Sequence, residues 1–178
     1  MNIIRENEHI DSVLANWQDF IGNDFNAYKN HVYRVLNFAA SLHPLSPDEH
    51  EKLSIAAAFH DLGIWSHNTL DYLDPSIKLM ETWLVGNGKA GWFEELGRIV
   101  AEHHKLRPIK DLPIAETFRK ADMIDLTKGR FKHGLPKSHI RDVFDALPTH
   151  GFHKRLTQLT FNQIKNNPFS NPFPMLKW

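Results

Sequence analysis

A histidine and an aspartate stand side by side at the end of an apolar segment. Residues 53–59 read Leu-Ser-Ile-Ala-Ala-Ala-Phe, and His60 and Asp61 follow them directly. A segment of this composition is expected to be buried, and a buried carboxylate costs several kcal/mol unless it is paired, hydrogen-bonded or bound to a cation. Any fold of this chain must therefore bring compensating groups to Asp61, and a metal ion is the most economical of them.

The residue types available for such a site are limited by the absence of cysteine. The chain has 12 histidines and no cysteine, which excludes disulfides, thiolate nucleophiles and zinc–thiolate sites. Any metal must therefore be held by nitrogen and oxygen atoms. With 178 residues, of which 42% are hydrophobic, the chain is expected to form one domain with a sizeable core.

Charge and hydropathy narrow the class of partner. Lys and Arg total 21 and Asp and Glu total 21, a balance that argues against bulk binding of nucleic acid or anionic membranes. No apolar stretch approaches the roughly 20 residues of a membrane span. The N-terminus has no basic region followed by an apolar core, so no signal peptide is visible. We therefore predict a cytoplasmic protein that acts on a small molecule, with homo-oligomerisation left open.

Hydrophobic spacing predicts helices along nearly the whole chain and no strands, and hence an all-α fold built as a single-domain helical bundle. Ser46-Pro47-Asp48-Glu49 is a strong helix start, with Gly63 as the expected stop of that helix. The other expected helices span 27–40 (capped by Asp24 or Asn26), 74–86, 92–104, 114–128, 137–147 and 152–166. The Pro- and Phe-rich segment 166–174 is expected to form an extended strip packed on the domain.

Further polar residues fall on apolar helix faces. His31 lies about two turns into its helix on the inward side, and His103-His104 closes another helix. Asp122 points along an apolar face, and Asp125, three residues on, shares that side. A single buried histidine is usually an ordinary core residue, but four such intrusions on separate helices favour a metal site, which helical bundles commonly build in their cores.

The order of these residues resembles the HD superfamily of metal-dependent phosphohydrolases. The signature is carried by Tyr-Lys-Asn-His-Val-Tyr-Arg-Val, Ala-Phe-His-Asp-Leu-Gly and Arg-Lys-Ala-Asp-Met-Ile-Asp, which span residues 28 to about 126. The resemblance implies one HD-type domain over 1–178, with C-terminal helices and tail at 136–178. It also implies that one divalent cation is bound by His31, His60, Asp61 and Asp122. It does not extend to Asp125, because the motif aspartate is the one that follows alanine.

The pair His103-His104 leaves open whether the site binds a second metal ion. Binuclear members, including cyclic-dinucleotide phosphodiesterases of the HD-GYP kind and HD-fold iron oxygenases, recruit extra histidines, and the aspartate of their doublet bridges the two metals. Here Lys105 replaces the acid that follows the pair in the phosphodiesterases, and Leu-Arg-Pro stands in place of Gly-Tyr-Pro. Residues 70–102, between the His-Asp doublet and this pair, contain no further histidine that could serve as a ligand. One and two ions are about equally compatible with the sequence, with His103 and His104 as the additional ligands.

The resemblance implies hydrolysis of a phosphomonoester or phosphodiester by a metal-activated water, with nucleotides as the leading guess. Imidazole and carboxylate ligands favour manganese, iron, cobalt, nickel or zinc over magnesium. We assign catalytic roles to Asp61, Arg34 and Lys105. Arg34 and Lys105 are also the expected clamps on the substrate phosphate, with Arg107 behind them, and Glu102 is a candidate proton carrier.

Two other functions stay open at this level. A di-iron oxygenase or a small-molecule hydratase on the same scaffold would use His103 and His104 for a second metal, and a binding module would hold a purely structural metal. The basic residues close to the ligands favour the hydrolase. Metal stoichiometry, combined with a broad panel of phosphate esters, separates these functions.

Overall fold

The computed structural model describes residues 2–166, 171, 174 and 175. Within these residues the chain forms α-helices and two short 3-10 helices, with no strand, so the predicted all-α class is confirmed. The elements are α1 Glu8–Ala15, α2 Gln18–Ile21, η1 Gly22–Asp24, α3 Phe25–Leu42, α4 Pro47–Phe59, α5 Gly63–Ser66, α6 Leu73–Gly86, η2 Ala90–Trp92, α7 Phe93–Glu102, α8 Pro113–Leu126, α9 Lys137–Ala146 and α10 Phe152–Asn166.

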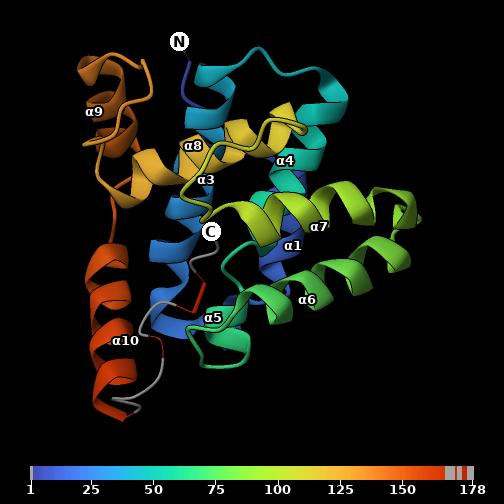
Figure 1. Ribbon diagram of the computed structural model, residues 1–178, viewed down its shortest axis with the longest axis vertical. Helices are drawn as coiled ribbons and strands as arrows, with labels where there is room; N and C mark the ends of the chain where they lie inside the picture. Colours follow the sequence, from blue (N-terminus) through green and yellow to red (C-terminus); the bar gives the residue numbers. More distant parts are fainter. Residues whose placement is uncertain (1, 167–170, 172–173, 176–178) are drawn as a thin grey trace.

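Helix α3 is the central element of this arrangement. Figure 1 shows α8 crossing it, α4 and α1 on one side, and α9 and α10 on the other, while α6 and α7 form an outer pair. Eleven of the 18 residues of α3 are buried, so the helix is covered on nearly every side. A helix with this environment can carry polar side chains such as His31 and Arg34 into the core, provided that neighbouring helices supply their partners.

One of the two predicted helix N-caps is present in the structure and the other is not. Ser46 and Glu49 form the predicted capping box at the start of α4, with Pro47 at the first helical position. The predicted cap of α3 by Asp24 is wrong, because η1 leads directly into α3 and Asp24 already has near-helical dihedrals. Its carboxylate instead accepts a hydrogen bond from Trp65 Nε1 (3.1 Å) and forms an ion pair with Arg155, whose Nε lies 3.0 Å away.

Gly63 does not act as the helix stop that the sequence predicts. Helix α4 ends at Phe59, and Gly63 begins the short helix α5. A Cβ atom at Gly63 would lie 2.4 Å from the carbonyl oxygen of Tyr72 and 2.9 Å from Ser76 Oγ, which accepts a hydrogen bond from the Gly63 amide. Glycine is therefore required by close packing, and this packing brings the segment around Tyr72 against the His-Asp doublet.

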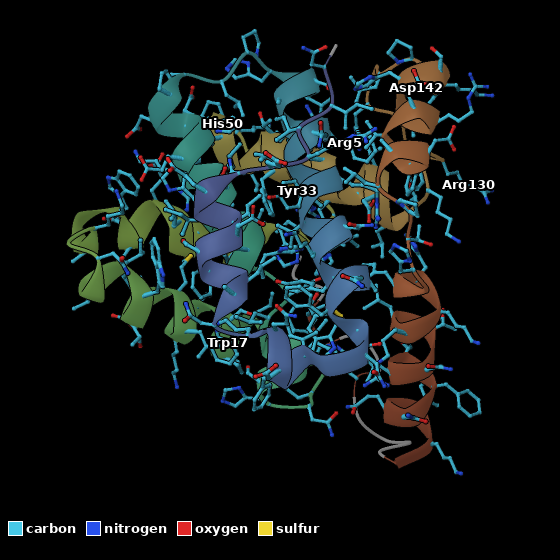
Figure 2. All side chains as sticks on the ribbon, turned by 180° about the vertical axis from the view of Figure 1, so that it is seen from behind. Arg5, Trp17, Tyr33, His50, Arg130 and Asp142 are labelled. Carbon is cyan, nitrogen blue, oxygen red and sulfur yellow. The ribbon has the colours of Figure 1, made fainter. Side chains whose placement is uncertain are left out.

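The N-terminal helix α1 was not expected from the sequence. Asn7 caps it by accepting hydrogen bonds from the amides of His9 and Ile10. The helix packs on α4, and Figure 2 shows Tyr33 of α3 beside it, where the Tyr33 hydroxyl accepts a hydrogen bond from the Asn7 amide (2.9 Å). The seven predicted longer helices all form, with ends within two residues of those expected except for α4, which ends four residues before the expected stop at Gly63.

Two other expectations concern the tail and the membrane. Most of the expected extended strip 166–174 lies outside the described residues. Among the helices that are described, none combines the length and the apolar character needed to cross a bilayer.

The close approach at Gly63 gives a stability prediction. Gly63→Ala should destabilise the fold by about 1–3 kcal/mol, because the backbone of Tyr72 cannot move away without disturbing α6. Urea unfolding followed by circular dichroism measures this change. Gly86→Ala is the matched control, because nothing lies within 4 Å of a Cβ at that position. Equal stability of the two variants would contradict this packing.

Candidate metal centre

Four helices bring histidine and aspartate side chains to one place in the core. They come from α3, from the turn after α4, from the end of α7 and from α8. All of them are buried except His104, whose side chain retains slight exposure. The residues are His31, His60, Asp61, His103, His104, Asp122 and Asp125.

Backbone carbonyls fix the orientation of two of the imidazole rings. His60 Nδ1 donates a hydrogen bond to the carbonyl of Ala57 (2.7 Å), and His103 Nδ1 donates to the carbonyl of Val100 (2.6 Å). Because a carbonyl can only accept, Nδ1 carries the proton in both rings and Nε2 presents a lone pair. The same three-residue spacing at the ends of α4 and α7 therefore directs two ligand atoms toward the centre.

Asp125 fixes the third ring. His31 Nδ1 lies 2.6 Å from Asp125 Oδ2, so His31 Nε2 also faces the centre. Asp125 is completely buried and accepts hydrogen bonds from Arg34 Nε and from a terminal Arg34 nitrogen (3.1 Å). Burial alone would raise the pKa of Asp125, but His31 and Arg34 hold that pKa below its ordinary value. The ionised carboxylate thus orients the ring, as the outer partners of metal-bound histidines do.

Two of the ring nitrogens approach each other closely. His31 Nε2 and His60 Nε2 are 2.9 Å apart, a distance at which two lone pairs require a proton or a cation between them. Burial lowers the pKa of His60 to about 3. Burial also lowers the pKa of His31, but Asp125 and Asp61 outweigh it and raise that pKa to about 9. Without a cation, His31 therefore keeps a proton that it donates to His60.

The carboxylates of Asp61 and Asp122 each face two pairs of histidines, of which the first is His31 with His60 and the second is His103 with His104. Asp61 Oδ2 lies 3.5 Å from His31 Nε2 and 3.4 Å from His60 Nε2, while Asp61 Oδ1 lies 3.5 Å from His103 Nε2. Asp122 is placed in the same way. Its Oδ1 lies 3.6 Å from His31 Nε2 and 3.8 Å from His60 Nε2. Its Oδ2 lies 3.7 Å from His104 Nδ1.

Unpartnered buried atoms test whether a cation fits. Asp61 Oδ1 and His103 Nε2 are both buried and have no hydrogen-bond partner within the described part of the chain. Two adjacent acceptors without a donor are costly in a protein interior. Ligand atoms within 4.8 Å of one another form three groups: His31, His60 and Asp122; His60, Asp61 and His103; and His103, His104 and Asp122. The donor set fits a divalent cation, and the second histidine pair supplies ligands for another.

The expected substrate clamp at Arg34 is wrong. Its guanidinium is fully buried and, besides binding Asp125, donates to the carbonyls of Leu147 (3.0 Å) and Pro148 (3.4 Å). It also packs against the ring of Phe144. Four of its five N–H groups are engaged in this way, and the side chain is not among those that line the cavity described below. Arg34 instead holds Asp125, and through it the metal-facing ring of α3.

Lys105 and Arg107 are not brought to the cavity beside the centre. Lys105 Nζ lies 3.1 Å from a carboxylate oxygen of Glu102, which also binds Arg98. Arg107 is exposed to solvent. Neither residue is among those that line the cavity. Glu102, expected as a proton carrier, is engaged in these surface ion pairs.

A cavity of about 260 Å³ opens beside the centre. Its polar end is formed by four residues of the cluster, and the rest of its lining, apart from Thr160, is apolar or aromatic. Phe152 stacks on His31 with ring centroids 4.0 Å apart, and the Tyr72 hydroxyl shares a hydrogen bond of 2.6 Å with His104 Nε2. The lining residues are His31, Asp61, His104, Asp122, Leu70, Tyr72, Leu126, Phe152, Leu156, Thr160 and Met175.

Sequence reasoning did not find Tyr72 or Phe152, because each lies at the start of a helix that carries no other ligand. Asp125 was noted on the correct face but without a role. Its only signal was its position three residues after Asp122 on the same helix.

Comparison with known proteins identifies one family. The family model of the HD domain matches residues 28–141, which is more than half of the chain. Neither the curated proteins nor the solved structures contain a significant match.

Cation binding should release protons. Because the pKa of His31 is about 9 without a cation, His31 is protonated at neutral pH, and a cation that takes its Nε2 lone pair must displace that proton. Apparent affinity for Mn²⁺ should therefore rise about tenfold between about pH 7 and pH 8. Calorimetry in two buffers of different ionisation enthalpy counts the protons. His139→Gln, remote on α9, is the control that should release the same number; Mn²⁺ binding without proton release would contradict this ligand set.

The carboxylate behind His31 gives a second prediction. Asp125→Asn should weaken Mn²⁺ binding by about 10- to 100-fold, because the ring loses the group that orients it. The variant should also unfold at lower urea concentration, since Arg34 stays buried without a charged partner. Calorimetry and urea titration measure the two effects. Asp142→Asn, an exposed carboxylate on α9, should change neither. Full affinity in Asp125→Asn would show that the ring is oriented by other contacts.

Proposed function

The chain belongs to the HD-domain family, whose members are mostly metal-dependent hydrolases, and from this premise we propose that it hydrolyses a small phosphate ester, either a phosphomonoester or a phosphodiester. The observation that carries the proposal is the convergence of two buried carboxylates and the ring nitrogens of two histidine pairs at one end of a cavity. Such a centre binds a cation, and the cavity gives the substrate access to it.

The ligands that would hold the cation are those with ring nitrogens and carboxylate oxygens facing the centre. They are His31, His60, Asp61 and Asp122, with His103 and His104 available for a second ion. A divalent cation bound there would polarise a phosphoryl oxygen and lower the pKa of a water molecule. Nitrogen and oxygen donors of this kind suit manganese, iron, cobalt, nickel or zinc.

The chain's own residues provide binding and order around the reacting atoms. Hydrolysis forms a bond between phosphorus and a water oxygen, breaks the bond to the ester oxygen and transfers a proton to that oxygen. Asp61 and Asp122 lie at the polar end of the cavity, where their carboxylate oxygens can accept a proton from the water. Phe152 covers one face of His31, which keeps bulk water from the ring.

Tyr72 is the residue placed to contact the substrate itself. Its hydroxyl lies at the polar end of the cavity and is hydrogen-bonded to His104. Burial and the two central carboxylates raise the pKa of Tyr72 well above its usual value, so the hydroxyl keeps its proton. A protonated hydroxyl in this place can donate to a phosphoryl or ester oxygen.

The second histidine pair supports one alternative function. Asp61 and Asp122 each direct one oxygen toward His103 or His104, an arrangement that suits two adjacent ions. A di-iron oxygenase or a hydratase on this scaffold would use that arrangement. Two iron ions per chain, together with no hydrolysis of any phosphate ester, would favour the alternative.

The proposed function is tested at Asp61. Asp61→Asn keeps the size of the side chain but removes the charge that faces both histidine pairs, so the bound metal should be lost and ester hydrolysis should fall at least about 100-fold. Metal content by mass spectrometry and phosphate release from a broad ester panel measure the two losses. Asp19→Asn, an exposed carboxylate on α2, is the control. Undiminished turnover in Asp61→Asn would refute the proposed site.

A further inference from the structure

The lining of the cavity beside the metal centre, as far as the structure describes it, contains no cationic side chain. Among the described residues that line it, none is lysine or arginine. Arg34 is buried and hydrogen-bonded to Asp125. Arg155 directly precedes the lining residue Leu156 but forms an ion pair with Asp24. Sites that bind several phosphates or a sugar phosphate through protein groups usually rely on arginine or lysine. Within the described part of the chain, the charge of a phosphate can therefore be balanced only by the cations of the centre.

The cavity wall offers few polar partners to the rest of a substrate. Thr160 donates its hydroxyl hydrogen to the carbonyl of Leu156 (3.0 Å), and Tyr72 is bonded to His104. The other wall residues are apolar: Leu70, Leu126, Phe152, Leu156 and Met175. A nucleobase or a ribose enclosed by this wall would lose hydrogen bonds to water without replacement, which is costly.

The apolar wall continues beyond the cavity. A groove of about 500 Å³ shares Leu126, Leu156 and Thr160 with it and runs along α10, past the polar residues His153 and Thr157, to Phe161 and Ile164. Leu126, Phe161 and Ile164 are 42%, 66% and 46% exposed, which is high for large apolar residues that lie together. Contiguous exposed apolar surface of this kind commonly marks a ligand site. Its continuity with the metal centre indicates that one ligand occupies both.

We propose, building on the proposed phosphoesterase function, that the substrate is an amphiphilic phosphate ester with an uncharged alkyl or aryl group. The phosphate lies at the polar end of the cavity, and the hydrocarbon lies against Leu126, Phe152 and Leu156. A longer chain continues into the groove along α10. This substrate class replaces nucleotides, the leading guess from the sequence, because it matches both the apolar wall and the lack of basic residues.

The experiment compares esters on the metal-loaded protein. Hydrolysis of ethyl, butyl, hexyl and phenyl phosphate is measured beside nucleoside 5′-monophosphates and ribose 5-phosphate. Each buried methylene should raise kcat/KM about fourfold, until the chain leaves the apolar wall. The matching alkylphosphonates have a carbon–phosphorus bond in place of the ester link and are not hydrolysed. Calorimetry with them gives binding without turnover, and affinity should rise with chain length in the same way.

A charge placed in the wall provides the variant test. Leu156→Lys should abolish the dependence on chain length in both assays, and Leu156→Thr, a milder change on a half-buried position, should reduce it. Gln158→Lys puts the same charge on an exposed position of α10 outside the cavity and groove, and should keep the dependence. Circular dichroism confirms that the helix is retained in each variant.

The outcomes separate the two proposals. If nucleotides or ribose 5-phosphate are hydrolysed faster than the alkyl and aryl esters, or if chain length has no effect, the substrate class is wrong while the proposed hydrolase function stands. If the metal-loaded protein hydrolyses no ester at all, the proposed function fails and the substrate class fails with it. Equal chain-length dependence in Leu156→Lys and Gln158→Lys would also overturn the placement of the hydrocarbon.

Discussion

The arrangement on which the site depends is the close approach of His31 Nε2 and His60 Nε2 beside two buried carboxylates. The two nitrogens are 2.9 Å apart, and Asp61 and Asp122 each place an oxygen within 3.8 Å of them. Lone pairs and negative charges so concentrated repel one another in a core that excludes water. A proton on His31 relieves part of this repulsion, and a divalent cation relieves more of it.

The fold tolerates this cluster because three of the imidazole rings are each held from behind by a second partner. Carbonyls at the ends of α4 and α7 fix His60 and His103, and Asp125 fixes His31. Asp125 is held in turn by Arg34, whose other donors bind carbonyls after α9. Removing any one support frees a ring rather than a helix. The metal-facing geometry therefore depends on these second partners. Ala57 and Val100 lie only three residues before the rings they hold, whereas Asp125 lies far from His31 in the sequence.

The sequence predicted the helices and the ligand types better than it predicted the use of the charges. Periodicity placed both ends of α3 and α8 within two residues, because their burial follows directly from apolar spacing. The same reasoning failed at Arg34, which helical spacing puts near His31 but which tertiary contacts bury against Asp125. Gly63 was mistaken for a helix stop because its constraint comes from Tyr72, a residue brought close only by the fold.

Charge balance connects the number of cations to the charge of the substrate. The buried cluster holds three carboxylates, from Asp61, Asp122 and Asp125, against one guanidinium, from Arg34, which leaves two negative charges when the histidines are neutral. One divalent cation cancels them and leaves nothing to balance a phosphomonoester dianion in a cavity whose described lining holds no lysine or arginine. Two divalent cations leave two positive charges, which match that dianion. A phosphomonoester substrate therefore favours occupation of the second histidine pair, whereas a neutral substrate would need only the first ion.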